Sequence, residues 1–554
     1  MGLRQDPKWI ERISNEKTRR EWMAEFKQTT GALSDKQVDY IFAELEYYAR
    51  LQTAAGNRAQ LTDVDMVWET MIDDCLRGEF MQQVTDALEG VPQKLQDWTT
   101  VREMEPTESR HFLNHTTDTR LKSNCRVLRL IDPSLYTLLF DKTPLLSQPM
   151  SSPQEALQLS SLGSIPGSHE AWKSAINELN DRMAGKNDYV PNSHYMRKLN
   201  PDDRHWLPAD IFVADDGSVE FRSYINNLHP IKYPKAYNAI AKVVSRCIPV
   251  LEQVLTDWKY VRNLRIPYDI DKCVHADTLH PNDPEFCHPE DSDSDFDFDA
   301  AAEDWDNNLV KTVPEPEEFE EPERPLTPHS LFNRNLQVVI KMDNFYLTPE
   351  NKCFPDEEWQ GDGTASEQII ATAVYCYDIE NVSELRIEFR ESICEVGLGS
   401  YVEARAYHFL FEVFVHSENF FFTQSAGSAD LKQGSLVCHP NIYQHQISSF
   451  SLKDESKPGH VKTMTLYFVD PAIRVVSTAL VPPQQQHWWI PSILDTPLLA
   501  KFPAEIQSMI ISSVDSPISF DTAAKARKIL DDRALVSNDD RGRFDIIVHD
   551  GDFL

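Results

Sequence analysis

The sequence predicts an α+β protein, with a double-stranded β-helix (a jelly roll) in the C-terminal half and a largely helical N-terminal half. Three observations indicate this class. Apolar residues recur every three to four positions near the N-terminus, eight short strand-like segments follow one another after residue 328, and an acidic run separates the two regions. Because 554 residues exceed what one core usually holds, we expect two or three domains.

The N-terminal half carries the spacing of amphipathic helices. The segments at 18–28 and 35–52 place apolar side chains three and four residues apart, as one buried helix face requires. A third helix with strong apolar periodicity is predicted at 236–261. Before it, the turn residues Asp-Asp-Gly at 215–217 separate two alternating apolar runs and predict a β-hairpin within residues 205–230.

The C-terminal half is predicted to be rich in short strands. Eight strands in succession are typical of a jelly roll or a similar antiparallel barrel. They are predicted at 336–347, 368–379, 385–392, 401–416, 434–440, 445–452, 463–470 and 473–481. The predicted divisions of the chain are a mostly helical region at 1–143, a Ser/Pro-rich connector at 144–168, a mixed α/β region packing on the barrel at 169–280, an acidic disordered insert at 281–328, the jelly roll at 329–492, and a C-terminal helical extension and tail at 493–554.

Charge narrows the range of expected partners. The net charge is −34, and between Asp283 and Arg324 there are 17 acidic residues against two basic ones. Such a chain is a poor partner for nucleic acid, and an acidic run is typical of a solvated, disordered segment. If the chain recruits a protein partner, the acidic insert is where we expect the contact.

The sequence favours a cytoplasmic protein with no membrane association. No apolar run approaches the roughly 20 residues that cross a bilayer, and residues 1–22 are charged and lack a signal-peptide core. Nine scattered cysteines favour reduced thiols. One local Cys/His cluster, at 271–288, offers residue types that zinc accepts, but its spacing matches no familiar finger and we expect a surface loop.

Polar residues at the ends of two predicted strands form a candidate site. Gln360 and Asp362 come just before the strand at 368–379, and His445 follows the strand at 434–440. Cupin-like jelly rolls build sites from side chains that point into the barrel, so we expect these three side chains to approach one another. Non-haem iron oxygenases place two histidines and a carboxylate on one face of the metal, and Gln360 stands where one histidine would be.

Further residues are expected to contact a substrate. An oxygenase that uses 2-oxoglutarate needs a downstream Arg or Lys to pair with that cosubstrate, and the sequence offers Lys462 and Arg474. The aromatic residues expected to line the mouth of the barrel are Trp359, Tyr375, Tyr377, Phe389 and Phe411. The histidines expected to be structural are His408, His439 and His460.

Most of the chain resembles the fungal family known as Domain of Unknown Function 4246. The stretches that carry the resemblance include HWLPADIFV, SYINNLHP, LQVVIKMDNFYLTPE, HPNIYQHQISSF and LYFVDPAIRVVSTALVPPQQQHWW. The Ser/Pro connector, the acidic insert and the extreme C-terminus lie outside it. That family in turn resembles iron(II)/2-oxoglutarate oxygenases, which implies a cupin-like jelly roll with iron(II) and 2-oxoglutarate as cofactors.

The departures from the family pattern fall in the site. The family's W-H-x-E-G reads W-Q-G-D-G at 359–363, its N-E-H reads S-E-Q at 366–368, and its G-H-R-K reads G-H-V-K at 459–462, whereas the distal histidine is kept in Q-H-Q at 444–446. An amide is a weak ligand for iron(II). A valine cannot pair with the cosubstrate carboxylate, which would cost several kcal/mol in a closed barrel. We therefore expect a degenerate site that favours neither a metal nor another cofactor.

The resulting hypothesis is a metal-independent enzyme of fungal secondary metabolism that acts on a small molecule. A cyclisation of Diels–Alder (pericyclic) type or an isomerisation needs only a pocket that orients its substrate and polarises a carbonyl. Gln360 would donate a hydrogen bond to a substrate oxygen, and Asp362 or His445 would position the substrate or move a proton. The alternatives are an iron(II)/2-oxoglutarate oxygenase with atypical ligands, using Asp362, His445 and Gln360 or a nearby histidine, and a non-catalytic binding protein.

Overall fold

The computed structural model describes residues 3–6, 8–30, 33–84, 88–89, 97–100, 126–140, 142–159, 163–167, 171–172, 174, 205–260, 315–364, 366–392, 423–494, 496–514 and 516–529. The chain forms two compact units. Unit 1 comprises Met1–Ala55, Tyr260–Leu326 and Phe389–Gly427, and unit 2 comprises Gly56–Lys259, Thr327–Glu388 and Ser428–Leu554. The Cys/His cluster at 271–288, the predicted strand at 401–416 with His408 and Phe411, and most of the acidic insert lie outside the described residues.

Unit 1 is built around helices near the N-terminus. They are η1 (Leu3–Gln5), α1 (Trp9–Ser14), α2 (Glu16–Thr30) and α3 (Asp35–Ala55). The two helices predicted at 18–28 and 35–52 are confirmed as α2 and α3. Trp22 of α2 and Phe42 of α3 meet edge to face with ring centroids 5.3 Å apart, which explains the apolar spacing of both segments.

A large antiparallel sheet dominates unit 2. In its described part it has ten strands in the order β1-β2-β12-β9-β15-β7-β4-β3, with β5 pairing with β7 and β6 pairing with β5. The strands are β1 (Gln60–Leu61), β2 (Trp68–Met71), β3 (Asp97–Thr100), β4 (Arg126–Ile131), β5 (Ala209–Val213), β6 (Val219–Phe221), β7 (Arg334–Leu347), β9 (Ile369–Glu380), β12 (Ser435–Pro440) and β15 (Gly459–Val469). The predicted hairpin is confirmed as β5 and β6.

Two smaller sheets accompany the large one. One has the order β11-β10-β13 and the other pairs β14 with β8. Their strands are β8 (Cys353–Phe354), β10 (Arg386–Ser392), β11 (Thr423–Asp430), β13 (Tyr443–Ile447) and β14 (Phe450–Ser451). Phe345 of β7 meets Phe354 of β8 with ring centroids 5.2 Å apart, so the pair β8–β14 packs against one face of the large sheet. We call this face the inner face.

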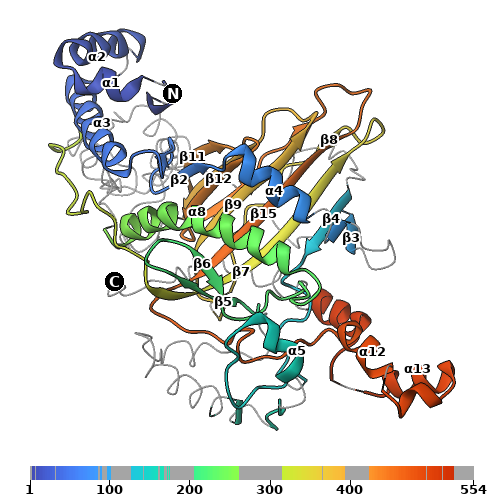
Figure 1. Ribbon diagram of the computed structural model, residues 1–554. Coiled ribbons are helices and arrows are strands. Elements are labelled where there is room, and N and C mark those ends of the chain that lie inside the picture. Colours follow the sequence, from blue (N-terminus) through green and yellow to red (C-terminus); the bar gives the residue numbers. More distant parts are fainter. Residues whose placement is uncertain are drawn as a thin grey trace, which may run out of the picture. The chain divides into compact units, whose positions relative to one another are not determined.

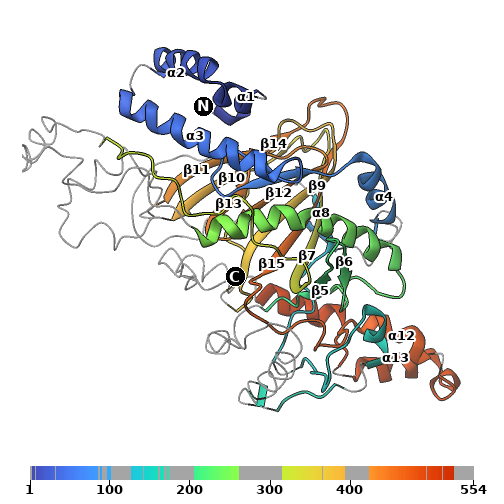
Figure 2. The same cartoon turned by 60° about the vertical axis from the view of Figure 1, so that its left-hand side comes forward.

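Helices cover the opposite face, which we call the outer face (Figures 1 and 2). The long helix α8 (Pro234–Lys259) and the shorter α4 (Asp74–Val84) lie across it. Phe80 of α4 meets Tyr377 of β9 at 5.2 Å, and the Nε1–H of Trp68 donates to Asp257 of α8 at 2.6 Å. The apolar stripe that predicts the helix at 236–261 is the side of α8 that the sheet buries.

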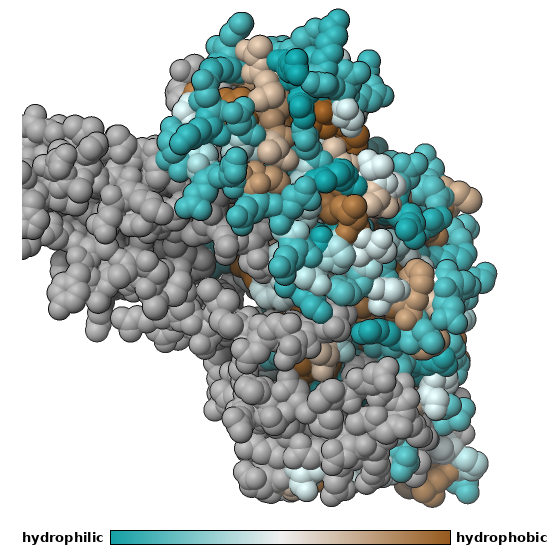
Figure 3. Space-filling view, turned by 90° about the vertical axis from the view of Figure 1, so that its left-hand side faces the viewer, coloured by the Kyte–Doolittle hydropathy of each residue, from teal (hydrophilic) through white to brown (hydrophobic). Residues whose placement is uncertain are grey.

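The remaining helices belong to the middle and the C-terminal part of unit 2. They are η4 (Pro153–Glu155), α5 (Ala156–Leu159), α12 (Gln486–Leu494), η8 (Leu499–Lys501) and α13 (Ala504–Ser512). No helix among the described residues is long and apolar enough to span a membrane. The described surface shown in Figure 3 is mainly hydrophilic, with hydrophobic side chains in small separate groups, as the high charge of the chain requires.

The predicted mixture of helices and antiparallel strands is confirmed, with two differences. Strands β1 to β4 come from the region predicted to be mostly helical and join the large sheet, so helical and strand-rich parts are not separated along the chain. The strand predicted at 473–481 is wrong. Its amides find single partners instead of a ladder: Val475 N donates to Gln337 Oε1 at 3.0 Å and Thr478 N donates to the Pro208 carbonyl at 2.9 Å.

Candidate metal centre

Three buried side chains of unit 2 converge at the inner face. Asp362, His439 and His445 each offer one ligand atom, and these atoms all lie within 4.8 Å of one another. The two imidazole rings have centroids 4.8 Å apart, and His445 Nδ1 lies 3.8 Å from Asp362 Oδ2. Asp362 and His445 are the residues that the sequence predicts to meet. His439, which we expected to be structural, is the third member.

The register of the sheet explains why His439 belongs to this group. Antiparallel partners point to the same face, and His439 of β12 pairs with Thr372 of β9. Thr372 donates its hydroxyl to Asp362 Oδ2 at 2.6 Å, which places both partners on the side of the carboxylate. The neighbouring Cys438 points the other way, because side chains alternate along a strand. His439 therefore reaches the site from a strand, whereas Asp362 reaches it from a loop.

The loop before β9 holds Asp362 in place. Its backbone N–H donates to Asn441 Oδ1 at 2.9 Å, and Asn441 Nδ2 donates back to the Asp362 carbonyl at 2.7 Å. The next residue, Gly363, has a φ of +71°, and a Cβ there would lie 2.8 Å from a side-chain carbon of Ile369. Any other residue would strain this turn, so Gly363 is required for the carboxylate to face the histidines.

His445 comes from β13 and is paired through its backbone with Gln360. Gln360 N donates to the His445 carbonyl at 3.0 Å, and His445 N donates to the Gln360 carbonyl at 2.9 Å. The side chain of Gln360 is exposed, whereas Asp362 and His445 are buried. Gln360, where the resemblance implies a histidine, is thus outside the buried donor group, and the second imidazole comes from His439.

Both histidines are poised as neutral ligands. Burial, together with the neighbouring His445, lowers the pKa of His439 to about 3. Burial, followed by the charge of Lys341, lowers the pKa of His445 to about 4. Among the described residues, His445 Nδ1 is buried without a hydrogen-bond partner. Leaving such an atom unsatisfied costs about 1–3 kcal/mol, and because metals bind unprotonated imidazole, a bound cation would satisfy it.

Charged groups surround the three donors. Lys341 of β7 forms an ion pair with Asp343, with Nζ and Oδ2 2.8 Å apart. Burial raises the pKa of the Glu357 carboxyl, and the charges of Lys341, Asp343 and Asp362 all act on it. Arg129 of β4 is the strand partner of Asp343 and adds a second cation to this region. A divalent cation bound by Asp362 would add further positive charge beside that carboxylate.

Two of the predicted aromatic residues lie on the face opposite the donors. Tyr375 and Tyr377 of β9 are buried against Phe80 of α4, with ring centroids 5.6 and 5.2 Å away, so they lie on the outer face. Trp359 is partly buried in the loop before Gln360, and Phe389 is buried on β10. Their role in substrate binding stays a prediction, with the two tyrosines separated from the donors by the sheet itself.

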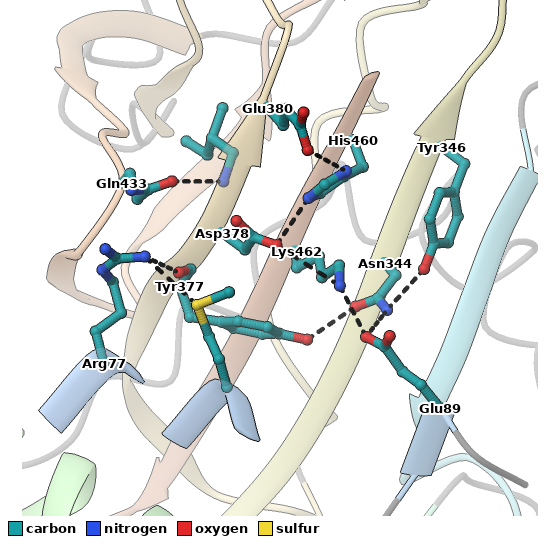
Figure 4. Close-up of polar contacts among 12 residues, drawn as sticks. Arg77, Glu89, Asn344, Tyr346, Tyr377, Asp378, Glu380, Gln433, His460 and Lys462 are labelled. Atoms are coloured by element: carbon teal, nitrogen blue, oxygen red, sulfur yellow. Dashed lines mark hydrogen bonds and ion pairs between the residues drawn. The ribbon is translucent and has the colours of Figure 1, made fainter. Parts of the chain in front are cut away.

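Both predicted basic residues are paired with carboxylates. Lys462 of β15 is on the outer face, where its Nζ lies 3.0 Å from Glu89 Oε1 and 3.6 Å from Asp378 Oδ2 (Figure 4). Arg474 is buried in an ion pair with Asp210. Val461, where the resemblance implies an arginine, is buried on β15 opposite Phe345 and so belongs to the inner face. Its neighbour Lys462 therefore cannot substitute for it, because alternate residues of a strand face opposite sides.

Two residues of the site were missed by sequence reasoning. His439 lies at an odd position of β12 and Lys341 at an odd position of β7, and both share the inner face with Thr372. The sequence shows that side chains alternate along each strand. Only the register between strands shows whether the odd-numbered or the even-numbered residues point toward Asp362. The lysine is hidden in a long apolar strand and has no motif around it.

Comparison with known proteins identifies the family. A family model described as "Protein of unknown function (DUF4246)" matches residues 35–492, which is most of the chain. The chain belongs to this family. Its matched region includes Asp362, His439 and His445 together with the strands that carry them. No curated protein matches the DUF4246 chain.

Solved structures show only distant likenesses to this DUF4246 protein. IDO from Bacillus thuringiensis matches with 6% identity over 24% of this chain and 45% of its own, at a TM-score of 0.15. A bsmA homolog from Methylobium petroleophilum PM1 matches with 11% identity over 26% and 45%, at 0.16. The Fe(II)/(alpha)ketoglutarate-dependent dioxygenase TqaL matches with 9% identity over 60% and 83%, at 0.20. The chain spans less than half of the first two, and such low TM-scores do not establish a shared fold.

Proposed function

We propose that this chain is a metal-dependent enzyme that transforms a small molecule, with Asp362, His439 and His445 as the ligands of one divalent ion. The observation that carries the proposal is the convergence of these three buried donors within 4.8 Å. Two imidazoles and one carboxylate, with further positions left open, are the ligand set of non-haem iron(II) sites, and we therefore propose iron(II) as the ion.

The scaffold that we propose for this site is a double-stranded β-helix, or cupin-like jelly roll. From β7 onward the chain passes back and forth between two layers. Strands β7, β9, β12 and β15 enter the large sheet, whereas β8, β10, β11, β13 and β14 enter the smaller sheets. Alternation of this kind is typical of jelly rolls, whose sites lie between the layers. Asp362 and His445 come from the loop and strand that face His439 across this space.

The protein's own residues prepare the site for a cation. When bound, iron(II) acts as a Lewis acid and offers open positions to substrate or oxygen. Asn441 and Thr372 fix the carboxylate, and such supporting contacts usually contribute 10–100-fold to metal affinity. Burial keeps both imidazoles unprotonated and keeps bulk water away from the donors.

The residues present do not fit 2-oxoglutarate as they fit a metal. Of the predicted basic residues, Lys462 is on the outer face and Arg474 is paired with Asp210, while Val461 is apolar. Lys341 is on the inner face, but Asp343 already neutralises its charge. We therefore propose metal-dependent chemistry without this cosubstrate, and we route no step through it.

Metal analysis of the purified full chain tests the proposal. The wild type is expected to bind one divalent ion per chain, measured by elemental analysis and by titration with cobalt(II), whose visible spectrum reports the nitrogen and oxygen ligands. His439→Phe is expected to lose the ion. His460→Phe is the matched control, because His460 lies on the outer face beside Asp378, and it is expected to keep the ion. A wild-type chain without stoichiometric metal affinity contradicts the proposal.

A second candidate is the metal-independent cyclisation or isomerisation in fungal secondary metabolism. The observation that favours it is the combination of the exposed Gln360 and the apolar Val461 at positions where the family's pattern has His and Arg. In that case His445 would act as a neutral base and Lys341 would polarise a carbonyl. Treatment with a chelator distinguishes the two candidate functions. The treated protein keeps its product-forming activity only if the reaction needs no metal.

A further inference from the structure

Lys341 and Asp343 form an ion pair on the inner face that leaves part of both groups unused. They are two residues apart on β7, so they point to the same side of the sheet. Lys341 Nζ lies 2.8 Å from Asp343 Oδ2, and 28% of the lysine side chain is accessible against 7% of the aspartate. The pair is therefore a part of the inner face that a small molecule can approach from the lysine side.

In the described part of the chain, the groups left without a partner are an acceptor on Asp343 and donors on Lys341, and they lie side by side. Among the described residues, Oδ1 of Asp343 is buried and has no hydrogen-bond partner. An ammonium group has three N–H donors, and the ion pair with Asp343 engages one of them. A ligand that donates one hydrogen bond and accepts another would satisfy both groups together.

Sheet register places this pair on the same face as His439, on a strand three places from β12 in the sheet. His439, Thr372, Tyr467 and Val339 form one row of partners across β12, β9, β15 and β7. Lys341 and Thr465 belong to the next row on the same face.

We infer that Lys341 and Asp343 are the specificity-determining pair of the metal site and that they bind a neutral carboxamide group of the substrate. The carboxamide oxygen accepts from Lys341 Nζ, and its N–H donates to Asp343 Oδ1. This inference rests on the proposed function. A carboxylate at the same place brings no donor for Oδ1 and adds a negative charge beside Asp343 and Glu357.

Two matched probes test this pair on the full chain loaded with zinc. N-oxalylglycine and N-oxalylglycinamide share the oxalyl end that binds a metal, and they differ only in a terminal carboxylate or carboxamide. Calorimetry on the wild type is expected to show tighter binding of the carboxamide probe by about tenfold or more, since the carboxylate leaves a buried acceptor unsatisfied. Asp343→Asn is expected to abolish this preference, and Lys341→Met is expected to weaken both probes.

Controls on the outer face and a separate measurement of metal keep the outcomes distinct. Asp378→Asn and Lys462→Met change the same residue types in the same sheet, and they are expected to leave the ratio of the two affinities unchanged. A metal-loaded wild type that prefers the carboxylate probe, or an Asp343→Asn variant with an unchanged ratio, overturns the inference alone. A wild type that binds no zinc overturns the proposed function and this inference with it.

Discussion

The large sheet carries one polar cluster on each face, and the two differ in how far their groups satisfy one another. The outer cluster consists of Glu89, Asn344, Asp378, His460 and Lys462 (Figure 4). The inner cluster consists of Asp362, His439 and His445. The three inner side chains are buried, whereas the charged side chains of the outer cluster are partly buried. The clusters also differ in the partners that each group has.

In the outer cluster, each charged group has an opposite charge or a donor beside it. Lys462 Nζ lies 3.0 Å from Glu89 Oε1, and Asn344 Nδ2 donates to the same oxygen at 2.9 Å. His460 Nε2 lies 2.7 Å from Asp378 Oδ2. A network of this kind stabilises the fold and leaves little capacity for a ligand.

In the inner cluster, one imidazole nitrogen lacks a hydrogen-bond partner within the part of the chain that the structure describes. His445 Nδ1 lies 3.8 Å from Asp362 Oδ2, too far for a hydrogen bond, and has no hydrogen-bond partner among the described residues. Holding the three donor side chains in this arrangement costs free energy in the folded state, and binding of a metal ion would offset that cost. Deeper burial together with an unsatisfied imidazole nitrogen distinguishes the proposed metal site from the outer cluster.

The largest effect is expected from removing an imidazole of the inner cluster. His439→Phe keeps a planar side chain at the end of β12 but removes a ligand, so metal affinity should fall by more than about 100-fold, beyond the usual effect of supporting residues. Titration with cobalt(II) measures the loss. Gln360→Ala is a useful companion because its side chain is exposed, and it should bind cobalt(II) as the wild type does. Equal affinities in the wild type and His439→Phe would break the comparison.

A supporting contact of the inner cluster should give the next largest effect. Thr372→Val keeps the shape of the side chain and removes the hydroxyl that donates to Asp362 Oδ2. We expect metal affinity to fall by about 10–100-fold, because removal of a residue that hydrogen-bonds to a metal ligand usually lowers the affinity by that factor. Competition with a chelator of known affinity gives the value. Thr465→Val, on the next row of the same face, is the matched control and should change the affinity little.

The outer cluster should affect stability and leave metal binding unchanged. Lys462→Met keeps the length of the side chain but leaves Glu89 and Asp378 without their ammonium partner. The free energy of unfolding should fall by about 1–3 kcal/mol, as expected when a partly buried hydrogen-bonded charge loses its partner. Urea denaturation measures this change. A loss of metal affinity in the same variant would show that the two faces are coupled and that the division drawn above is wrong.

Much of the fold was predictable because it depends on local periodicity. Helices α2, α3 and α8 and strands β7, β9, β12 and β15 follow from apolar spacing along short segments. Strand β11 (Thr423–Asp430) reads TQSAGSAD, which has no apolar alternation, so only its pairing with β10 makes it a strand. The recruitment of β1 to β4 into the large sheet likewise depends on contacts between distant segments, which periodicity does not record.

The site was predictable only in part, for a related reason. Asp362 and His445 follow from motif positions at strand ends, and the structure brings them together. His439 and Lys341 depend on which face of a strand points inward, and that is decided by register with β9 and β15. A histidine that changes strand while keeping its place in space is invisible to a motif, because motifs compare positions along the chain.

The smallest effect is expected from acid, and it distinguishes the two clusters by the pH at which each responds. Burial opposes ionisation of Asp378, but the hydrogen bond and charge of His460 and the charge of Lys462 outweigh it, so the pKa of Asp378 is lowered from 3.8. A carboxyl group with a lowered folded pKa adds stability above its unfolded pKa and loses it as the pH falls through the folded value. Asp378→Asn should therefore lower the free energy of unfolding at and above about pH 5. The difference from the wild type should shrink below about pH 4.

The inner histidines respond in another pH range. Their folded pKa values of about 3 and about 4 lie below the ordinary 6.5. Below pH 6.5 the unfolded chain takes up protons that the folded chain does not, so the metal-free protein loses stability there. Urea denaturation of both proteins across this pH range measures the two windows. If the Asp378→Asn difference already shrinks between pH 6.5 and pH 5, Asp378 responds together with the histidines and the outer cluster is not the independent structural network described here.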